Sequence, residues 1–197
     1  MKTLAGACKY EEVIRKSRFV AHAAPVTSQA ETLAFYESVA DSGATHNCWA
    51  WRIDHQYRSN DDGEPSGTAG RPILATIEGR NLQRVMVVVT RWYGGIKLGV
   101  GGLARAYGGC AAKCLDRARI IDWAPRVECE LQADFALAST VHQLLQQFDA
   151  TKLNEDFDTG GLKMTISLEQ ARFRALSVAL ADASSGTAKL ALRAASR

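Results

Sequence analysis

The chain has 197 residues, of which 47% are hydrophobic and 23% are charged, and these fractions are ordinary for a globular protein. Its net charge of +3, from 24 basic and 21 acidic residues, is too small to imply nucleic-acid binding unless basic residues cluster locally. The five scattered cysteines argue against a secreted disulfide framework. The sequence predicts no signal peptide and contains no apolar run of the roughly 20 residues that cross a bilayer. We therefore expect a cytoplasmic protein without a membrane partner.

The first 53 residues predict a strand pair, a helix and an aromatic strand. Two extended segments within 9–26 flank a polar turn at 15–17, and Pro25 disfavours helix before the next element. Ser28 and Glu31 form a capping-box pattern for a helix that ends at Ser42-Gly43. Its expected apolar face carries Leu33, Tyr36, Val39 and Ala40. Residues 46–53 alternate as a strand, with Trp49 and Trp51 on one face.

The middle of the chain predicts a long loop, two helices and one buried strand. Residues 54–70 show no regular period and predict a loop, after which Thr68 is the expected N-cap of a helix that ends at Gly79. The β-branched run at 84–90 is typical of a strand that is buried on both faces. A stripe of small residues over 103–118 predicts a helix packed closely on a sheet, and 119–122 predict a short strand.

The pattern changes near Pro125, where we place a domain boundary between 1–124 and 125–197. The second half predicts strand, helix, strand pair, helix and strand, over 126–134, 135–149, 150–157 with 161–168, 169–183 and 187–193. This βαββαβ order is that of a ferredoxin-like domain. The expected fold class is therefore α+β, with a two-layer α/β domain first and a ferredoxin-like domain second.

Two glycine-rich loops, Gly63–Gly70 and Gly94–Gly102, flank the buried strand and are the main candidates for function. Glycine backbone N–H groups and a helix N-terminus favour anions, and basic side chains of Arg91, Lys97 and Arg105 lie beside the second loop. The alternative is structural: the glycines permit close packing, and the basic residues pair with acidic residues of the first loop. From the residues alone, both interpretations stay open.

Several sharper motifs are disfavoured. Gly99–Ala104 fits a dinucleotide fingerprint, but eight residues separate it from the strand and no second mononucleotide half follows. The second loop lacks the G-K-[ST] ending of a P-loop. Cys110 and Cys114 lie on the apolar face of a helix, where free cysteines pack as small hydrophobes, so we predict no zinc and no cofactor.

Two further functions remain as hypotheses. In the first, the loop Asp61-Asp62-Gly63-Glu64 holds magnesium, and the protein is an enzyme acting on a nucleotide or phosphorylated small molecule. In the second, an exposed face of the second domain serves as a protein scaffold. No nucleophile–base pair is visible, and His46 is the histidine that adjoins the glycine-rich region.

Three motifs in this order resemble the signature of the IMPACT family, in the layout of its bacterial YigZ-type members. They are HNCWA at 46–50, DDGEPSGTAG at 61–70, and RWYGGIKLG at 91–99 followed by GGLARAYG at 101–108. The resemblance covers nearly the whole chain. It implies a first domain like domain IV of elongation factor G and the second domain of a small-subunit ribosomal protein, and a second domain like domain V of that factor.

Eukaryotic members of this family act in translational control, where they restrain activation of a kinase. The sequence does not carry their additional N-terminal module, so we expect translation-linked binding of RNA or of a ribosome-associated protein and not kinase regulation. We predict no catalytic residue and no bound metal ion. The predicted binding residues are Arg71, Arg91, Tyr93, Gly94, Gly95, Lys97, Gly101, Gly102 and Arg105, with the acidic-loop residues Asp61, Asp62, Glu64 and Thr68 and, in addition, His46.

Overall fold

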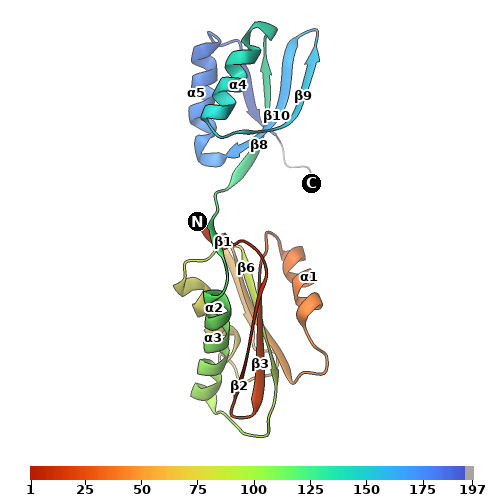
Figure 1. The fold of residues 1–197 in the computed structure, drawn as a ribbon, viewed down its shortest axis with the longest axis vertical. Coiled ribbons are helices and arrows are strands. Elements are labelled where there is room, and N and C mark those ends of the chain that lie inside the picture. Colours follow the sequence, from red (N-terminus) through yellow and green to blue (C-terminus); the bar gives the residue numbers. More distant parts are fainter. Residues whose placement is uncertain (194–197) are drawn as a thin grey trace. The chain divides into compact units, whose positions relative to one another are not determined.

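The structure is a computed structural model that describes residues 1–193 of the chain. It consists of two compact units, Met1–Trp123 and Ala124–Arg197. Both mix helices with antiparallel sheets, which confirms the predicted α+β class (Figure 1). Trp123 is anchored in the first unit: its backbone N–H donates to the Met1 carbonyl, and the Arg84 guanidinium lies 3.7 Å from the centre of its ring.

The first unit is built on a five-stranded antiparallel sheet in the order β2-β3-β6-β4-β5. Its strands are β2 (Cys8–Ile14), β3 (Ser17–Pro25), β4 (His46–Ile53), β5 (Gln56–Asn60) and β6 (Val85–Trp92). The continuous run of valines puts β6 at the centre of the sheet, because neighbours on both edges and layers on both faces exclude water there. A separate pair, β1 (Lys2–Leu4) and β7 (Ile120–Asp122), joins the two ends of the unit's chain.

Helices cover the two faces of this sheet unequally (Figure 1). Helices α2 (Gly70–Gly79) and α3 (Val100–Asp116) pack on one face and bury the larger core. Helix α1 (Gln29–Val39) packs on the other face against Trp51, Met86 and Val88. The prediction for Leu33 was wrong, since its side chain is 59% exposed, whereas Thr32, one position earlier, is buried together with the face that carries Tyr36 and Val39.

The long loop expected over 54–70 is shorter than predicted. Residues Gln56–Asn60 form the edge strand β5, in which every residue is exposed. The strand is held by its backbone pairing with β4, and its side chains therefore show no alternation between apolar and polar that a sequence could reveal. The remaining loop, 61–69, leads directly into α2.

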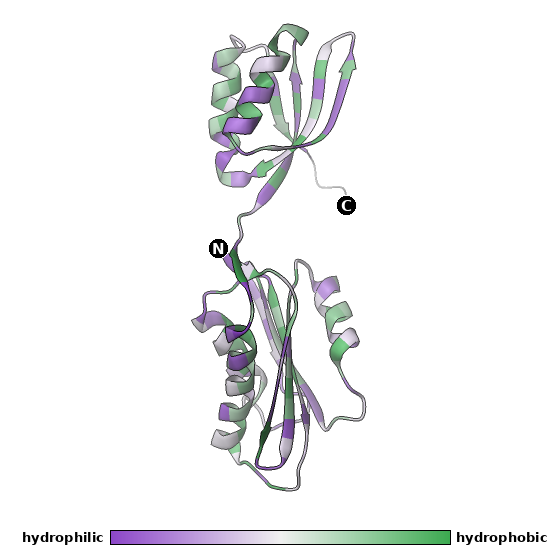
Figure 2. Cartoon of the chain, viewed as in Figure 1, coloured by the Kyte–Doolittle hydropathy of each residue, from purple (hydrophilic) through white to green (hydrophobic). Residues whose placement is uncertain are grey.

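The second unit has the expected ferredoxin-like order. Its elements are β8 (Arg126–Ala133), α4 (Ala138–Gln147), β9 (Thr151–Asp158), β10 (Gly161–Glu169), α5 (Phe173–Ala183) and β11 (Lys189–Leu192), with short 3-10 turns before both helices. The sheet order is β11-β8-β10-β9, and both helices lie on one face of it (Figure 1). Along the helices of both units, hydrophilic and hydrophobic residues alternate (Figure 2), as expected where one helix face meets a sheet.

None of the helices within residues 1–193 is long and apolar enough to cross a membrane.

Candidate anion-binding end of the first unit

The two glycine-rich loops meet at one end of the five-stranded sheet. Strands β4 and β6 are antiparallel and pair His46 with Arg91, while β5 pairs Asn60 with Trp49. The start of β4 and the ends of β5 and β6 therefore lie at the same end of the sheet. The acidic loop that follows β5 and the glycine loop that follows β6 consequently lie beside each other, as a pocket lined by residues from both loops shows.

Asp61 and Asp62 organise the acidic loop from within. The Asp61 carboxylate accepts hydrogen bonds from the backbone N–H groups of Gly67, Ala69 and Gly70, at 2.8–2.9 Å. Burial acts to raise the pKa of Asp61, but these backbone hydrogen bonds outweigh it and hold the pKa below its ordinary value. One Asp62 oxygen accepts from the backbone N–H of Asn47 at 2.6 Å. Both carboxylates therefore stabilise the loop itself.

One expectation about this loop was wrong. Thr68 does not cap α2: its hydroxyl donates to the Pro65 carbonyl at 2.6 Å, and Asp61 satisfies the first backbone N–H groups of the helix from eight residues away. The three carboxylates of the magnesium hypothesis already have partners within the protein: Asp61 and Asp62 accept from backbone N–H groups, and Glu64 accepts from an arginine. Within residues 1–193, no three His, Cys, Asp or Glu side chains are grouped as metal ligands.

Glu64, Arg91 and Tyr107 form a buried polar cluster under the two loops. The Glu64 and Arg91 side chains are 4% and 6% exposed, and the Arg91 guanidinium lies 2.5 Å from Glu64 Oε1. The Tyr107 hydroxyl donates to the same oxygen at 2.7 Å. Burial raises the pKa of Tyr107 far above its ordinary range, so the hydroxyl stays a donor. The cluster ties the acidic loop to β6 and α3.

Arg91, one of the predicted binding residues, is buried, with 5% of its surface exposed. Its register on β6 points the side chain to the face covered by α2 and α3, where Val85, Val87 and Val89 also lie. The guanidinium is paired with Glu64 and also donates to the Ser17 hydroxyl at 3.3 Å. Arg91 therefore stabilises the fold. This agrees with the structural interpretation of the loops, in which basic residues pair with acidic residues of the first loop.

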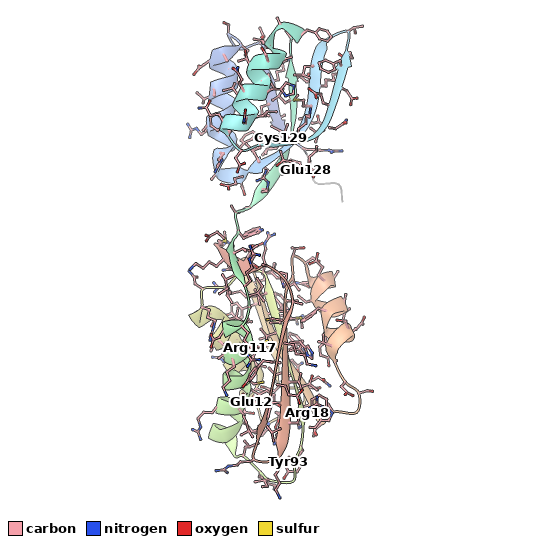
Figure 3. The ribbon with its side chains drawn as sticks, viewed as in Figure 1. Glu12, Arg18, Tyr93, Arg117, Glu128 and Cys129 are labelled. Atoms are coloured by element: carbon pink, nitrogen blue, oxygen red, sulfur yellow. The ribbon has the colours of Figure 1, made fainter. Side chains whose placement is uncertain are left out.

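The other basic residues of the prediction are exposed. Lys97 lies in the glycine loop, Arg105 in the second turn of α3, and Arg71 in the first turn of α2. Tyr93 follows β6 with 44% of its surface exposed, and Figure 3 shows it near the same end of this unit as Arg18. Gly95 lies in the glycine loop with Lys97, and Gly101 and Gly102 lie in the first turn of α3.

Gly94 explains why the second loop needs glycine. A Cβ atom at this position would lie 1.9 Å from the carbonyl oxygen of Lys16, closer than any side chain permits. The backbone N–H of Gly94 also donates to the Ser17 hydroxyl at 3.2 Å. The glycine loop is therefore packed directly on the turn between β2 and β3.

That turn brings two charged residues that the sequence did not single out. Arg15 and Lys16 form a two-residue hairpin turn in which both have positive φ, of 44° and 66°. Arg15 and Arg105 line one hollow of about 250 Å³ together with Leu98, and Leu98 also borders the pocket that Lys97 lines. We call the four exposed residues Arg15, Lys16, Lys97 and Arg105 the basic tip. None of them forms an ion pair within the described part of the chain.

A pocket of about 490 Å³ opens beside the basic tip. Its walls are mainly apolar and come from Pro65, Tyr93, Leu98, Val100 and Leu103, while Glu64, Arg91, His46 and Lys97 supply the polar groups. His46 Nδ1 lies 2.7 Å from the Asp62 carbonyl oxygen, and His46 Nε2 lies 3.8 Å from Glu64 Oε1. The predicted residue His46 is thus part of this pocket.

Comparison with known proteins identifies both units. The model of the Impact N-terminal domain matches residues 15–115, and that of a domain of unknown function, DUF1949, matches residues 131–187. IMPACT family member YigZ from Escherichia coli (strain K12) is 37% identical over 186 residues, which cover 91% of each chain. An IMPACT family member from Thermus thermophilus is 49% identical over 137 residues, or 68% of this chain and 74% of the relative.

The eukaryotic relatives match over a shorter region. Human Protein IMPACT is 41% identical over 95 residues, which are 43% of this chain and 29% of that protein. A crystal structure described as that of a hypothetical protein has a TM-score of 0.72 at 34% identity, and the match covers 99% of this chain and 98% of the other. These matches span both units and confirm the resemblance that the three motifs indicated, so the chain is a member of the IMPACT family.

Proposed function

We propose that this chain is a non-catalytic, translation-linked binding protein that engages RNA through the basic tip. The observation that carries the proposal is the strained turn at Arg15 and Lys16. A two-residue hairpin turn with positive φ at both positions is best filled by Asn-Gly or similar pairs, and non-glycine residues in this region cost about 1–2 kcal/mol each. Residues in strained backbone conformations cluster at functional sites.

The surroundings of the turn also favour RNA. Four exposed basic side chains lie at one end of the unit, and the nearby carboxylates of Asp61 and Asp62 are occupied by backbone N–H groups. Phosphates of an RNA backbone would replace water around these cations and release counterions. Tyr93, nearly half exposed, offers an aromatic face on which a base can stack. Membership in a family whose eukaryotic members act in translational control agrees with an RNA partner.

The test compares two triple variants that remove the same charge. Lys16, Lys97 and Arg105 changed to alanine should weaken binding of a fluorescein-labelled single-stranded RNA, measured by anisotropy, about 10-fold or more near 100 mM salt. The control changes Lys2, Lys9 and Arg119, which are exposed basic residues away from the tip. Arg91 stays unchanged in both, because its loss would disturb the buried cluster.

Equal affinities of the two variants would refute a specific role of the basic tip. If wild-type protein bound no RNA but could be cross-linked to a ribosomal protein, that protein would be the partner and the RNA proposal would fail. These outcomes distinguish RNA binding from a protein-scaffold function.

A further inference from the structure

The pocket beside the basic tip contains a carboxylate oxygen without a partner. Glu64 Oε1 accepts from both Arg91 and Tyr107, whereas Glu64 Oε2 makes no hydrogen bond with any residue in 1–193. The Glu64 side chain is 4% exposed and lines the pocket. This oxygen is not fully enclosed, so a ligand or water in the pocket can supply its donor.

The imidazole of His46 adds a second acceptor. The Asp62 carbonyl oxygen can only accept, so His46 Nδ1 carries the proton of their 2.7 Å hydrogen bond. In the neutral ring, Nε2 then has a free lone pair, and it lies 3.8 Å from Glu64 Oε1. The pocket thus presents two acceptors, from Glu64 and from His46, beside Arg91, whose buried Nε has no hydrogen-bond partner, and the two acceptors suit a ligand with two donors on one edge.

The walls and the entrance restrict the ligand further. Tyr93, Leu98, Val100 and Leu103 provide apolar surfaces that suit a flat ring. Lys97 lies at the pocket together with Gly99 and Val100, where α3 begins. Free backbone N–H groups at a helix N-terminus, combined with a lysine, favour a phosphate group. A ring with donors at the floor and a phosphate at the entrance is a nucleotide.

Guanine is the base whose edge fits the floor. Its Watson–Crick edge offers two adjacent donors, N1–H and the N2 amino group, whereas adenine and cytosine each present one amino donor beside an acceptor, and uracil one N–H between two carbonyls. From this chemistry, we infer that the pocket binds an unstacked guanosine 5′-phosphate unit, with its base on Glu64 and His46 and its phosphate at Lys97. The inference rests on the proposed RNA-binding function and names the nucleotide that the same end of the molecule selects.

The ligand itself provides the sharpest test. Single-stranded RNAs of eight residues, with one guanosine, adenosine, cytidine or inosine in an otherwise uridine background, are titrated at pH 8. Guanosine should bind about 10-fold more tightly than adenosine or cytidine, and inosine, which lacks the N2 amino donor, should lose most of that advantage. Equal affinities for the four RNAs would overturn the inference and leave RNA binding through the basic tip standing.

GMP separates this inference from the proposed function. If GMP bound more tightly than AMP while none of the RNAs bound, the pocket would be a site for a free nucleotide and the RNA function would be refuted. If neither nucleotides nor RNAs bound, both proposals would fail.

Two protein variants address the two ends of the pocket. Glu64→Gln replaces an acceptor with an amide and should abolish the guanosine preference, provided that circular dichroism shows a folded chain. Val100→Glu changes a 66% exposed residue in the first turn of α3, where an acidic side chain favours the helix. It should weaken GMP binding about 10-fold by repelling the phosphate, and unchanged GMP affinity would contradict the assignment of the phosphate to this entrance.

Discussion

Removing Glu64 should destabilise the first unit more than removing any exposed carboxylate. In Glu64→Ala, the Arg91 guanidinium would remain buried without its counter-charge, and the Tyr107 hydroxyl would lose its acceptor. Breaking a buried ion pair on one side costs about 3–5 kcal/mol. A hydrogen bond to a charged group contributes about 2 kcal/mol, which sets the expected cost of Tyr107→Phe. Glu64→Gln keeps both acceptor contacts and should cost less than the alanine variant.

Tryptophan fluorescence during urea unfolding measures this effect in the relevant unit. The chain has four tryptophans, at 49, 51, 92 and 123, all within Met1–Trp123. Glu78→Ala, on the exposed side of α2, is the matched control and should change the free energy of unfolding by less than about 0.5 kcal/mol. If Glu64→Ala cost no more than this control, the cluster would not hold the two loops together, and the reasoning would be refuted.

Three further predictions concern the loops and the buried thiols. Asp61→Ala should cost about 2 kcal/mol of unfolding free energy, because three backbone N–H groups lose their acceptor. Since the pKa of Asp61 is lowered in the folded state, this stabilisation is complete above the unfolded pKa of about 4 and is lost as the pH falls through the folded pKa. Acid unfolding curves of the wild type and the variant will show the difference. Gly94→Ala should lower the melting temperature far more than Gly67→Ala, where φ is +76° but no atom lies within 4 Å of the added Cβ; equal shifts in calorimetry would count against the close contact with Lys16. Burial raises the pKa of Cys48 and Cys110 to about 12, so mass spectrometry should find both unmodified after a thiol reagent at pH 8 and modified in urea.

The regular elements followed from the sequence where side-chain pattern determines structure. The valine run of β6, the small-residue stripe of α3 and the turn at 158–161 each predicted the element that formed. Edge strand β5 was not predicted, because it is held by backbone pairing and its exposed side chains show no strand pattern. The role of Asp61 at the N-terminus of α2 was not predicted, because the loop between them has a conformation that no local sequence pattern indicates.

The candidate site was predictable in place but not in detail. Helix α2 lies between the first loop and β6 and carries the chain back along the sheet, so the two loops share one end of it, as the pocket lined by both loops shows. Which basic residue is buried depends on strand register, and the sequence pattern did not show that Arg91 turns inward to Glu64. Arg15 and Lys16 join the site across the sheet through strand order, which a reading along the chain does not reveal. Their signal was a hairpin turn without glycine or asparagine.

The double variant Arg15→Asn with Lys16→Gly tests the central claim most directly. It relieves both positive-φ residues and should stabilise the hairpin, so any loss of RNA binding cannot come from unfolding. The measurement is the slope of log affinity against log salt concentration for single-stranded RNA. If Arg15 and Lys16 each neutralise one phosphate, the slope should be shallower by about 1.4 than that of the wild type. An unchanged slope and affinity would show that the basic tip does not bind RNA.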